Sequence, residues 1–344
     1  MKKINNPKLV TKSSSQLTIN ADKQNAGYKL YIVINAGSGD KNATSVTTEL
    51  AKLFNDASQP HEFFICCRPD DMSAMTKQAI AQAASKNGAV VAAGGDGTIR
   101  YIAQEALAAD LPFGVLPLGT FNYFARDNEI PQDVIAAAEV LIKSVRVGYE
   151  RPVQVGLLND QVFLVNASLG LYPQLLEDRE KFKQEHGRSR IMARWAGLIS
   201  LLKLDIKMLL RIENDAGKHE SGKEVVRAST IFVGNNQLQL DDVGLNNEAR
   251  SVENGQLAII ALSPMTAFQR VLVAFRGLFR LLSNSPNVTH FSCHKLIVEP
   301  LSHHRKHFKV ATDGEVSKMK SPFVFRVGPQ PLRLIMPPSV GLEK

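Results

Sequence analysis

Residues 94–98, Gly-Gly-Asp-Gly-Thr, carry the sharpest chemical signal in this sequence. They follow the apolar run AVVAA and precede a helical pattern. Glycine lets a backbone turn sharply and approach a ligand closely, and the amides at the start of a helix face anions well. Thr98 can cap that helix or bind a phosphate oxygen. We therefore expect a phosphate-binding turn made of Gly94, Gly95, Asp96, Gly97 and Thr98.

Asp96 is the unusual member of this turn, because a carboxylate repels phosphate. We expect Asp96 to accept hydrogen bonds from sugar hydroxyls or backbone amides, or to hold a metal ion. The alternative for the whole stretch is a tight structural turn that binds nothing.

Two more apolar runs end in turns of similar chemistry. The run PFGVLP, residues 112–117, is followed by Gly119, Thr120 and Asn122 of the segment PLGTFNYFAR. The first run of the chain ends in INAGSG, with Asn35 and Ser38. In a parallel sheet the carboxyl ends of the strands meet at one edge, where ligands bind. Three such turns at one edge are hard to explain by folding alone, so they predict a binding site.

Alternating strands and helices position these turns. Apolar strand-like runs are separated by helical patterns at a pitch typical of βαβ units and a doubly wound parallel sheet. The expected strands are residues 28–34, 61–67, 89–93 and 112–117, and the expected helices are residues 44–55, 73–86, 98–109 and 134–143. The first part of the chain is therefore expected to be an α/β domain.

The pattern changes near Val145. From there on, short β-rich segments are separated by turn residues, which predicts a second domain built mainly on an antiparallel sheet. We expect a flexible tail over residues 1–27, an α/β domain over 28–145 and a β-rich domain over 146–330. Residues 331–344 contain the run LRLIMP, which could pair back with the first domain.

Composition limits the classes of partner and compartment. The chain has 344 residues, a formal net charge of +8 and three cysteines. The positive charge permits contact with phosphates or anionic lipids, and the absence of basic arms with aromatics disfavours nucleic acid. No secretory leader and no apolar run of about 18 residues is found. We expect a cytoplasmic protein that makes peripheral contact with the inner membrane surface; the sequence specifies no oligomeric state.

Two helical segments within the β-rich part are candidates for that membrane contact. Residues 187–203 are basic at their start, and residues 265–283 place Phe268, Val271, Leu272, Phe275 and Leu282 on one face, with Gln269, Arg276 and Arg280 on another. Such a helix can lie on an anionic membrane surface. The more common arrangement is a helix packed on the sheet with a solvated basic rim.

Four ordered motifs give the chain a resemblance to the diacylglycerol kinase catalytic-domain family, which includes bacterial soluble lipid kinases and sphingosine kinases. The family patterns are Asn-Pro-x-Ser-Gly, Gly-Gly-Asp-Gly-Thr, Pro-x-Gly-Thr-x-Asn-Asp-Phe-Ala-Arg and a late Asp-Gly-Glu. Here they read NAGSG, GGDGT, PLGTFNYFAR and TDGE, over roughly residues 29–337. The resemblance implies a phosphofructokinase-like nucleotide-binding α/β domain followed by a β-sandwich domain, with the active site in the cleft between them.

The resemblance also implies roles for individual residues. ATP, accompanied by Mg²⁺, would bind at residues 94–98 with help from Thr120, and Asn35 and Ser38 would shape the pocket. Asp313 and Glu315 of the late motif would supply the general base for the lipid hydroxyl, since an alcohol near neutral pH is a poor nucleophile. We favour Glu315, with Asp313 as the alternative. The implied activity is transfer of the γ-phosphate of ATP to a hydroxyl of a diacylglycerol-like or related lipid.

Three departures from the family pattern put substrate choice in question. Arg100 and Tyr101 replace the usual Asn and Glu after the glycine motif, and Tyr123 replaces the usual Asp in the following motif. Asn254 replaces an Asp where many bacterial members hold a structural magnesium, partly through backbone carbonyls that would here belong to Ser251 and Gln256. Because a neutral amide binds magnesium more weakly than a carboxylate does, a metal site at Asn254 is expected to be degenerate.

Two other functions remain open at this point. An NAD kinase shares the architecture and the Gly-Gly-Asp-Gly motif, although the motif at 115–126 and the late TDGE favour a lipid kinase. A lipid- or nucleotide-binding protein that has lost catalysis is suggested by the departures at Tyr101, Tyr123 and Asn254. The intact Asp96, Thr98, Asp313 and Glu315 argue against it.

Overall fold

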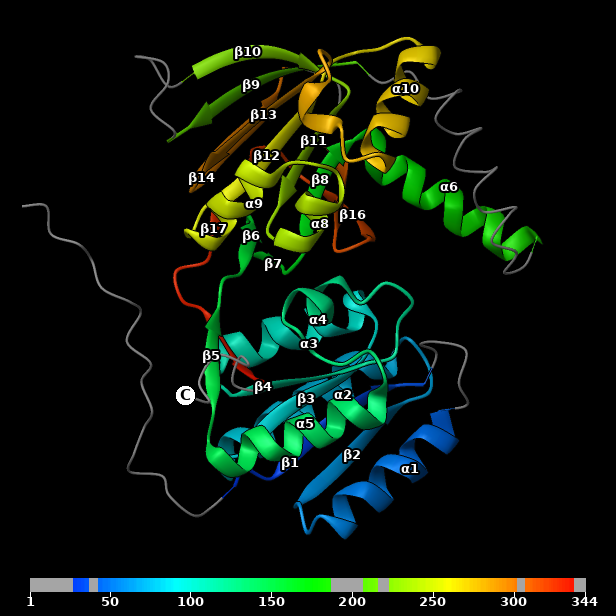
Figure 1. The fold of residues 1–344 in the computed structure, drawn as a ribbon, viewed down its shortest axis with the longest axis vertical. Coiled ribbons are helices and arrows are strands. Elements are labelled where there is room, and N and C mark those ends of the chain that lie inside the picture. The colour runs from blue at the N-terminus through cyan, green and yellow to red at the C-terminus, as the bar shows by residue number, and fades with distance from the viewer. Residues whose placement is uncertain (1–26, 37–42, 187–206, 216–222, 302–306, 337–344) are drawn as a thin grey trace, which may run out of the picture.

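The chain folds into two parts joined by a narrow connection (Figure 1). The computed structural model describes residues 27–36, 43–186, 207–215, 223–301 and 307–336. The tail predicted over residues 1–27, except Gly27, and the basic segment predicted over residues 187–203 lie outside these ranges. None of the helices within them is long and apolar enough to span a bilayer.

The first part is a six-stranded sheet, here called the first domain together with its helices. Its strands run in the order β2-β1-β3-β4-β18-β5, and every neighbouring pair is parallel except β18 and β5. The strands are β1 (Leu30–Asn35), β2 (His61–Cys66), β3 (Ala89–Gly94), β4 (Phe113–Pro117), β5 (Glu150–Val153) and β18 (Leu332–Ile335). The predicted α/β fold with a parallel sheet is confirmed.

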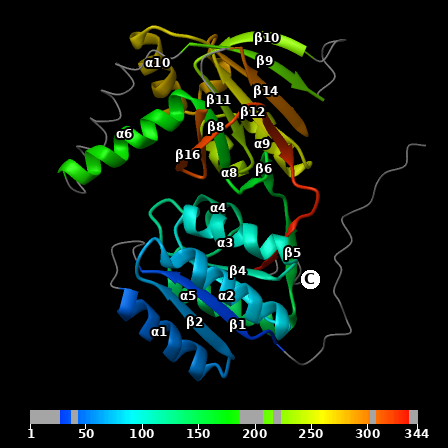
Figure 2. The ribbon, with the colours of Figure 1, turned by 180° about the vertical axis from the view of Figure 1, so that it is seen from behind.

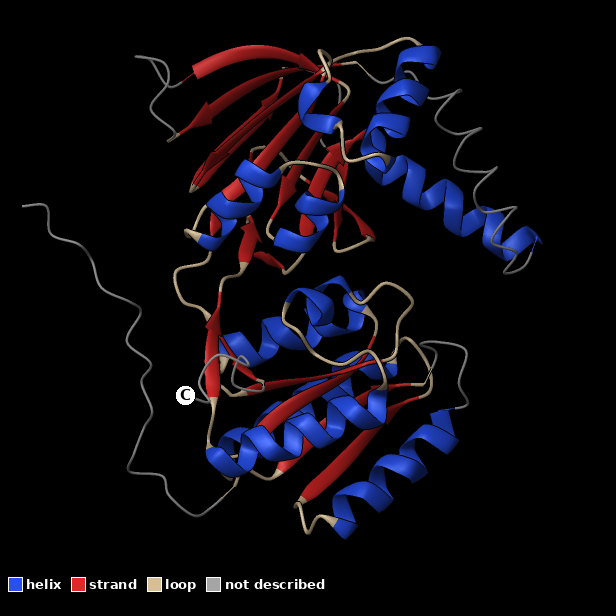
Figure 3. Cartoon of the chain, viewed as in Figure 1, coloured by secondary structure: helices blue, strands red, loops and turns tan. Residues whose placement is uncertain are grey.

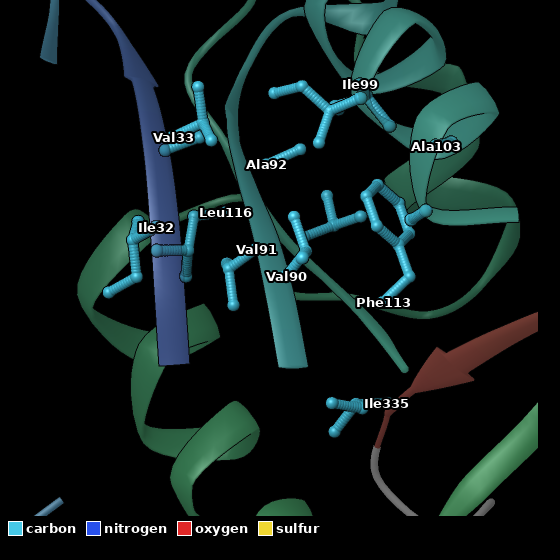
Figure 4. Packing of buried hydrophobic residues seen from close by; sticks show 14 of the residues in the cluster. Ile32, Val33, Val90, Val91, Ala92, Ile99, Ala103, Phe113, Leu116 and Ile335 are labelled. Carbon is cyan, nitrogen blue, oxygen red and sulfur yellow. The ribbon is translucent and has the colours of Figure 1, made fainter. Parts of the chain in front are cut away.

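Helices cover both faces of this sheet. Helix α1 contacts α5, and α2 contacts α3 on the opposite face (Figures 1 and 2). The helices are α1 (Ala43–Asp56), α2 (Asp71–Ser85), α3 (Asp96–Ala108), α4 (Tyr123–Asp127) and α5 (Val134–Val147). The central strands β3 and β4 are buried along their whole length between the two helix layers and carry no polar or charged side chain. Val90, Val91 and Phe113 of these strands pack together with Ile99 of α3 (Figure 4).

The start of α3 differs from the sequence prediction. The helix begins at Asp96, two residues before the predicted start at Thr98. Gly95 is extended, with φ −86° and ψ 178°, and stands in the N-cap position. Asp96 and Gly97 are therefore part of the first helical turn. An acidic residue is favourable there because it faces the positive end of the helix dipole.

The second part contains two antiparallel six-stranded sheets, here called the second domain (Figure 3). One has the order β10-β9-β14-β17-β6-β7 and the other β13-β12-β11-β8-β15-β16. They share one buried apolar cluster, which includes Phe163 and Phe325 from one sheet and Leu169 and Ile231 from the other. The strands are β6 (Gly156–Leu158), β7 (Gln161–Phe163), β8 (Asn166–Gly170), β9 (Met208–Asn214), β10 (Lys223–Ala228), β11 (Thr230–Gly234), β12 (Leu257–Leu262), β13 (Val288–Cys293), β14 (Lys295–Pro300), β15 (Phe308–Thr312), β16 (Glu315–Met319) and β17 (Phe323–Val327). The expected antiparallel sheets are present.

Helices on the outside of the second domain complete it. A second, smaller apolar cluster packs all of these helices except the first on the β11–β13 side and includes Leu240, Ala249, Ile260 and Val273. The helices are α6 (Leu171–His186), α8 (Gln237–Asp242), α9 (Asn246–Glu253), α10 (Ala267–Leu278) and the short η2 (Leu282–Asn284). The chain leaves the first sheet after β5 and returns to it at β18, which lies between β4 and β5.

Candidate active site

Two glycine turns meet at the carboxyl edge of the parallel sheet. A Cβ placed on Gly119 would lie 2.7 Å from the Cα of Gly95, and a Cβ on Gly94 would lie 2.6 Å from the Cβ of Thr98. Real Cβ atoms do not approach other atoms so closely, so a side chain at Gly119 would force the two turns apart, and one at Gly94 would displace Thr98 within its own turn. Gly119 is therefore needed for the close approach of the turns after β3 and β4, and Gly94 for the tight start of α3.

Asp96 holds the second turn in place. Its two carboxylate oxygens accept hydrogen bonds from the amides of Tyr123 and Phe124, each at 3.2 Å. Burial raises the pKa of Asp96, while these amides act in the opposite direction by favouring its charged form. Sugar hydroxyls, backbone amides or a metal ion were expected as partners of Asp96, and the partners seen in the structure are backbone amides. Asp96 thus fixes the first turn of α3 to the start of α4.

The turn after β1 joins the turn after β3 through a side-chain hydrogen bond. Asn35 Nδ2, at the end of β1, donates to Thr98 Oγ1 at 2.9 Å. Asn122 adopts a positive φ of 48° and donates from Nδ2 to the carbonyl of Gly119 at 2.9 Å. Ser38 lies outside the described residues. The remaining predicted nucleotide residues, including Thr120 next to Gly119, therefore lie together at one edge of the sheet.

Asp313 is a buried structural carboxylate of the second domain. It sits in the turn between β15 and β16, and its oxygens accept hydrogen bonds from the amides of Leu164, Val165 and Asn166 at 2.7, 2.8 and 2.9 Å. Burial raises the pKa of Asp313 to about 6, against the opposing effect of these three amides. With both oxygens occupied by the backbone, Asp313 ties the Asp-Gly-Glu hairpin to the strand entering β8.

This raised pKa has a measurable consequence for stability. An ordinary aspartate has a pKa of 3.8, and that of folded Asp313 is about 6. The folded state therefore binds the proton more tightly, so Asp313 lowers the free energy of unfolding as the pH rises from about 4 to 6. In urea titrations across this range, Asp313→Asn should lose that decrease. If the free energy of unfolding depends on pH in the same way in wild type and variant, the raised pKa of Asp313 is contradicted. Asp242→Asn, at an exposed ion pair with Arg280, serves as control.

Glu315 reaches from the second domain onto the glycine turn of the first. It is the first residue of β16, its side chain is 56% exposed, and its Oε2 accepts a hydrogen bond from Arg100 Nη2 at 2.6 Å. Its other oxygen, Oε1, is the nearest atom to the place that a Cβ on Gly97 would occupy. Glycine at position 97 thus makes room for the carboxylate. Sequence reasoning identified Glu315 and marked Arg100 only as a departure, so it missed their pairing.

A small cleft lies between the two domains beside the carboxylates of Asp96 and Asp313. Its volume is about 180 Å³, and it is lined by Asp96, Tyr123, Asn166, Asp313 and Gly314, among others. Tyr123, which replaces the usual Asp, stacks on Phe121 with ring centroids 6.0 Å apart. The cleft therefore has an aromatic wall from the first domain and a wall of mixed polar and apolar residues from the second.

A larger apolar pocket adjoins the cleft. It has a volume of about 710 Å³ and shares Tyr172 and Gln239 with the cleft. Most of its lining is apolar and comes from β11, β12, α8 and α10: examples are Phe232, Leu240, Ile260, Leu262, Val273 and Leu278. A cavity of this size and polarity suits an apolar ligand of moderate length.

Asn254 lies apart from this group, at the C-terminal end of α9. Its Nδ2 donates to the carbonyl of Arg250 at 3.0 Å, and the carbonyl of Ser251 accepts from the amides of Asn254 and Gln256 at 3.1 and 3.0 Å. Among the described residues, no group of three or more His, Cys, Asp or Glu side chains is placed to hold a metal ion. The donor set at Asn254 does not fit a structural magnesium, because it lacks the carboxylate.

Comparison with known proteins supports the motif assignment. Residues 29–156 match the family model described as the diacylglycerol kinase catalytic domain. A protein of Cronobacter sakazakii named "probable lipid kinase YegS-like" is 30% identical over 147 residues, which are 41% of this chain and 45% of that protein. The diacylglycerol kinase of Bacillus subtilis is 38% identical over 92 residues, or 26% of this chain and 29% of that one. The chain thus spans less than half the length of these curated relatives.

The fold is shared with solved structures over most of the chain. A crystal structure of a diacylglycerol kinase from Bacillus anthracis aligns with 91% of this chain and with 98% of its own chain, at a TM-score of 0.62 and 17% identity. At this identity the likeness shows the fold, which here includes both domains. Together with the four motifs, the matched residues 29–156 confirm the predicted resemblance to the diacylglycerol kinase catalytic-domain family.

Proposed function

We propose that the protein is an ATP-dependent kinase that transfers the γ-phosphate to a hydroxyl of a diacylglycerol-like or related lipid. One observation carries the proposal. The Glu315 carboxylate of the second domain lies against the glycine turn of the first, and its neighbour Gly314 lines a cleft that shares two lining residues with an apolar pocket. A base, a phosphate turn and a pocket for an apolar chain are thus adjacent.

The nucleotide is assigned to the turns at the carboxyl edge of the parallel sheet. Amides of residues 94–98 and of Gly119 and Thr120 would face the phosphates, with Asn35 and Asn122 shaping the turns. Ser38 keeps its sequence-based assignment to this pocket. Mg²⁺ would enter with ATP and neutralise charge on the transferred group. Asp96 acts indirectly, because its oxygens are held by the amides of α4.

Glu315 is the general base of the proposed reaction. Its side chain is half exposed at the glycine turn, and Oε1 faces Gly97. In the transfer step the lipid hydroxyl oxygen attacks the γ-phosphorus and its proton goes to Glu315 Oε1, while the bond from the γ-phosphorus to the bridging oxygen breaks and ADP leaves. Asp313, the alternative base, is fully engaged by three amides. Its role is to hold the hairpin that presents Glu315.

The apolar pocket is assigned to the lipid chain. Tyr172 and Gln239 line both the pocket and the cleft, so a lipid with its chain in the pocket would place its polar end toward Asp313 and Gly314. Burial of a chain there is favourable by about 0.8 kcal/mol for each CH₂ group. The acceptor is therefore a hydroxyl at the polar end of an amphipathic molecule.

Helix α10 is the proposed contact with an anionic bilayer. Phe268 and Leu278 are 77% and 75% exposed, and Leu272, Phe275 and Phe279 are exposed as well. The helix ends at Leu278, so Leu282, predicted on this face, instead lies buried in η2 after the chain turns at Arg280, where φ is 58°. The same helix lines the apolar pocket. Its exposed face is thus continuous with the lipid site.

Loss of apolar side chains on α10 should weaken membrane binding. We expect Phe268→Ser with Phe275→Ser to lower the partition coefficient on vesicles of phosphatidylcholine and phosphatidylglycerol by about tenfold or more, since burial of one such ring is worth about 1.5–3 kcal/mol. Vesicle co-sedimentation measures this. Val147→Ser removes an equally exposed side chain at the end of α5 and should bind like wild type. Equal binding of the α10 variant would rule out this surface.

A lipid-panel assay tests the proposed activity. Purified protein is incubated with radiolabelled ATP, magnesium and mixed micelles of diacylglycerol and related lipids. Label in a lipid product is expected, and no label in any lipid, with ATP binding verified separately, would reject the kinase. The comparisons favour neither alternative function. Conversion of NAD to NADP would support an NAD kinase, and ATP binding without any transfer would support a protein that has lost catalysis.

A further inference from the structure

Arg100 is buried at the contact between the two domains. It lies in α3, one turn after Asp96, and its side chain is only 6% exposed. Its Nη2 donates to Glu315 Oε2 at 2.6 Å, across 215 residues of sequence. The pair thus connects the helix of the phosphate turn to the first residue of β16.

The two carboxylate oxygens of Glu315 make different contacts. Oε2 is held by the guanidinium, whereas Oε1 lies nearest to the backbone of Gly97. A glutamate side chain free in solution samples many rotamers, and fixing one of them costs conformational entropy. A hydrogen bond from a buried guanidinium to one oxygen fixes the carboxylate, because the planar donor group has a defined direction.

We propose that Arg100 is a positioning residue that holds Glu315 with Oε1 over the glycine turn. The inference rests on the proposed function and goes beyond it by assigning a role to a residue that departs from the family pattern. In this role Arg100 contacts Glu315 and not the reacting atoms. It acts through Glu315, since misplacement of a reacting group by about 1 Å can cost about a hundredfold in rate.

The geometry explains why a neutral residue would not replace Arg100. A glutamine at this position is shorter than arginine and carries no charge, so the carboxylate would lose its charge-assisted hydrogen bond. A lysine keeps the charge but offers a flexible point donor in place of the fixed fork. We therefore expect Arg100→Gln to release Glu315 and Arg100→Lys to restore part of its placement.

A double-mutant cycle tests the role by kinetics. Arg100→Gln should lower kcat by about tenfold to a hundredfold, while KM for ATP stays within about twofold, and Arg100→Lys should recover part of the loss. In the Glu315→Gln background the same change should have almost no further effect, because the group being positioned is already gone. Arg211→Gln, which removes a comparable but exposed pair with Glu299 at 3.2 Å, serves as the control. Wild-type kinetics of Arg100→Gln, or effects that multiply in the double variant, would overturn the proposal.

A second measurement separates this inference from the proposed activity. In a crystal structure of Arg100→Gln, the Glu315 carboxylate should move away from Gly97 or lose defined density. An unchanged Glu315 would overturn the positioning role whatever the kinetics. If wild type labels no lipid, the kinase proposal is rejected, and this crystal structure alone then decides on Arg100. Equal midpoint temperatures of thermal unfolding for Arg100→Gln and Arg211→Gln exclude a general loss of structure.

Discussion

Replacement of Glu315 by glutamine should reduce lipid phosphorylation by a factor of about 10² to 10⁴, the range that a positioned general base contributes. The substitution keeps the size of the side chain and a carbonyl oxygen that can still accept from Arg100. It removes the capacity to take a proton from the acceptor hydroxyl. ATP binding, measured by calorimetry, should change little, because the assigned phosphate contacts are backbone amides. The rate is measured with radiolabelled ATP at saturating lipid.

The control for this prediction is Glu299→Gln. Glu299 pairs with an arginine as Glu315 does, but lies on β14, away from the glycine turns, and its side chain is 42% exposed. Its loss should leave the rate unchanged, since exposed ion pairs contribute about 0–1 kcal/mol to stability. A wild-type rate for Glu315→Gln would remove Glu315 as the base. A large loss for Glu299→Gln would show that the assay reports on folding and not on proton transfer.

Replacement of Gly119 by alanine should have the second largest effect, on nucleotide binding. The new Cβ would lie 2.7 Å from the Cα of Gly95 and 2.6 Å from Asn122 Oδ1. Backbone cannot yield as the end of a flexible side chain can, so the two turns must separate. We expect the ATP dissociation constant to rise at least tenfold, with a loss of about 1–3 kcal/mol in the free energy of unfolding, as is typical of overpacking.

Gly277→Ala is the matched control for that change. Gly277 lies within α10 and has open space where a Cβ would go. Alanine favours a helix interior by about 1 kcal/mol over glycine, so this variant should be equally or more stable and bind ATP normally. Calorimetric titration with ATP and urea unfolding give both quantities. Normal ATP affinity in Gly119→Ala would place the nucleotide away from these turns.

Much of the local structure followed from the sequence. The apolar runs and helical patterns predicted the alternating elements of the first domain, because strand and helix periodicity are properties of short segments. The glycine motifs marked the ends of β3 and β4, where turns need residues without a Cβ. Four ordered motifs also indicated the family. The start of α3 was placed two residues late, since the contact of Asp96 with α4 is not visible in a local pattern.

The sequence by itself determined the fold class, the order of the turns and the residue types at the site. Only the tertiary structure decided which contacts each of these residues makes. It gave Asp313 three backbone amides and left Glu315 at the glycine turn, although the two stand two positions apart in one motif. It also showed that Arg100, which the sequence marked only as a departure from the family pattern, donates a hydrogen bond to Glu315. The physical reason is that hydrogen bonds across 215 residues depend on how two domains pack, which no local periodicity encodes.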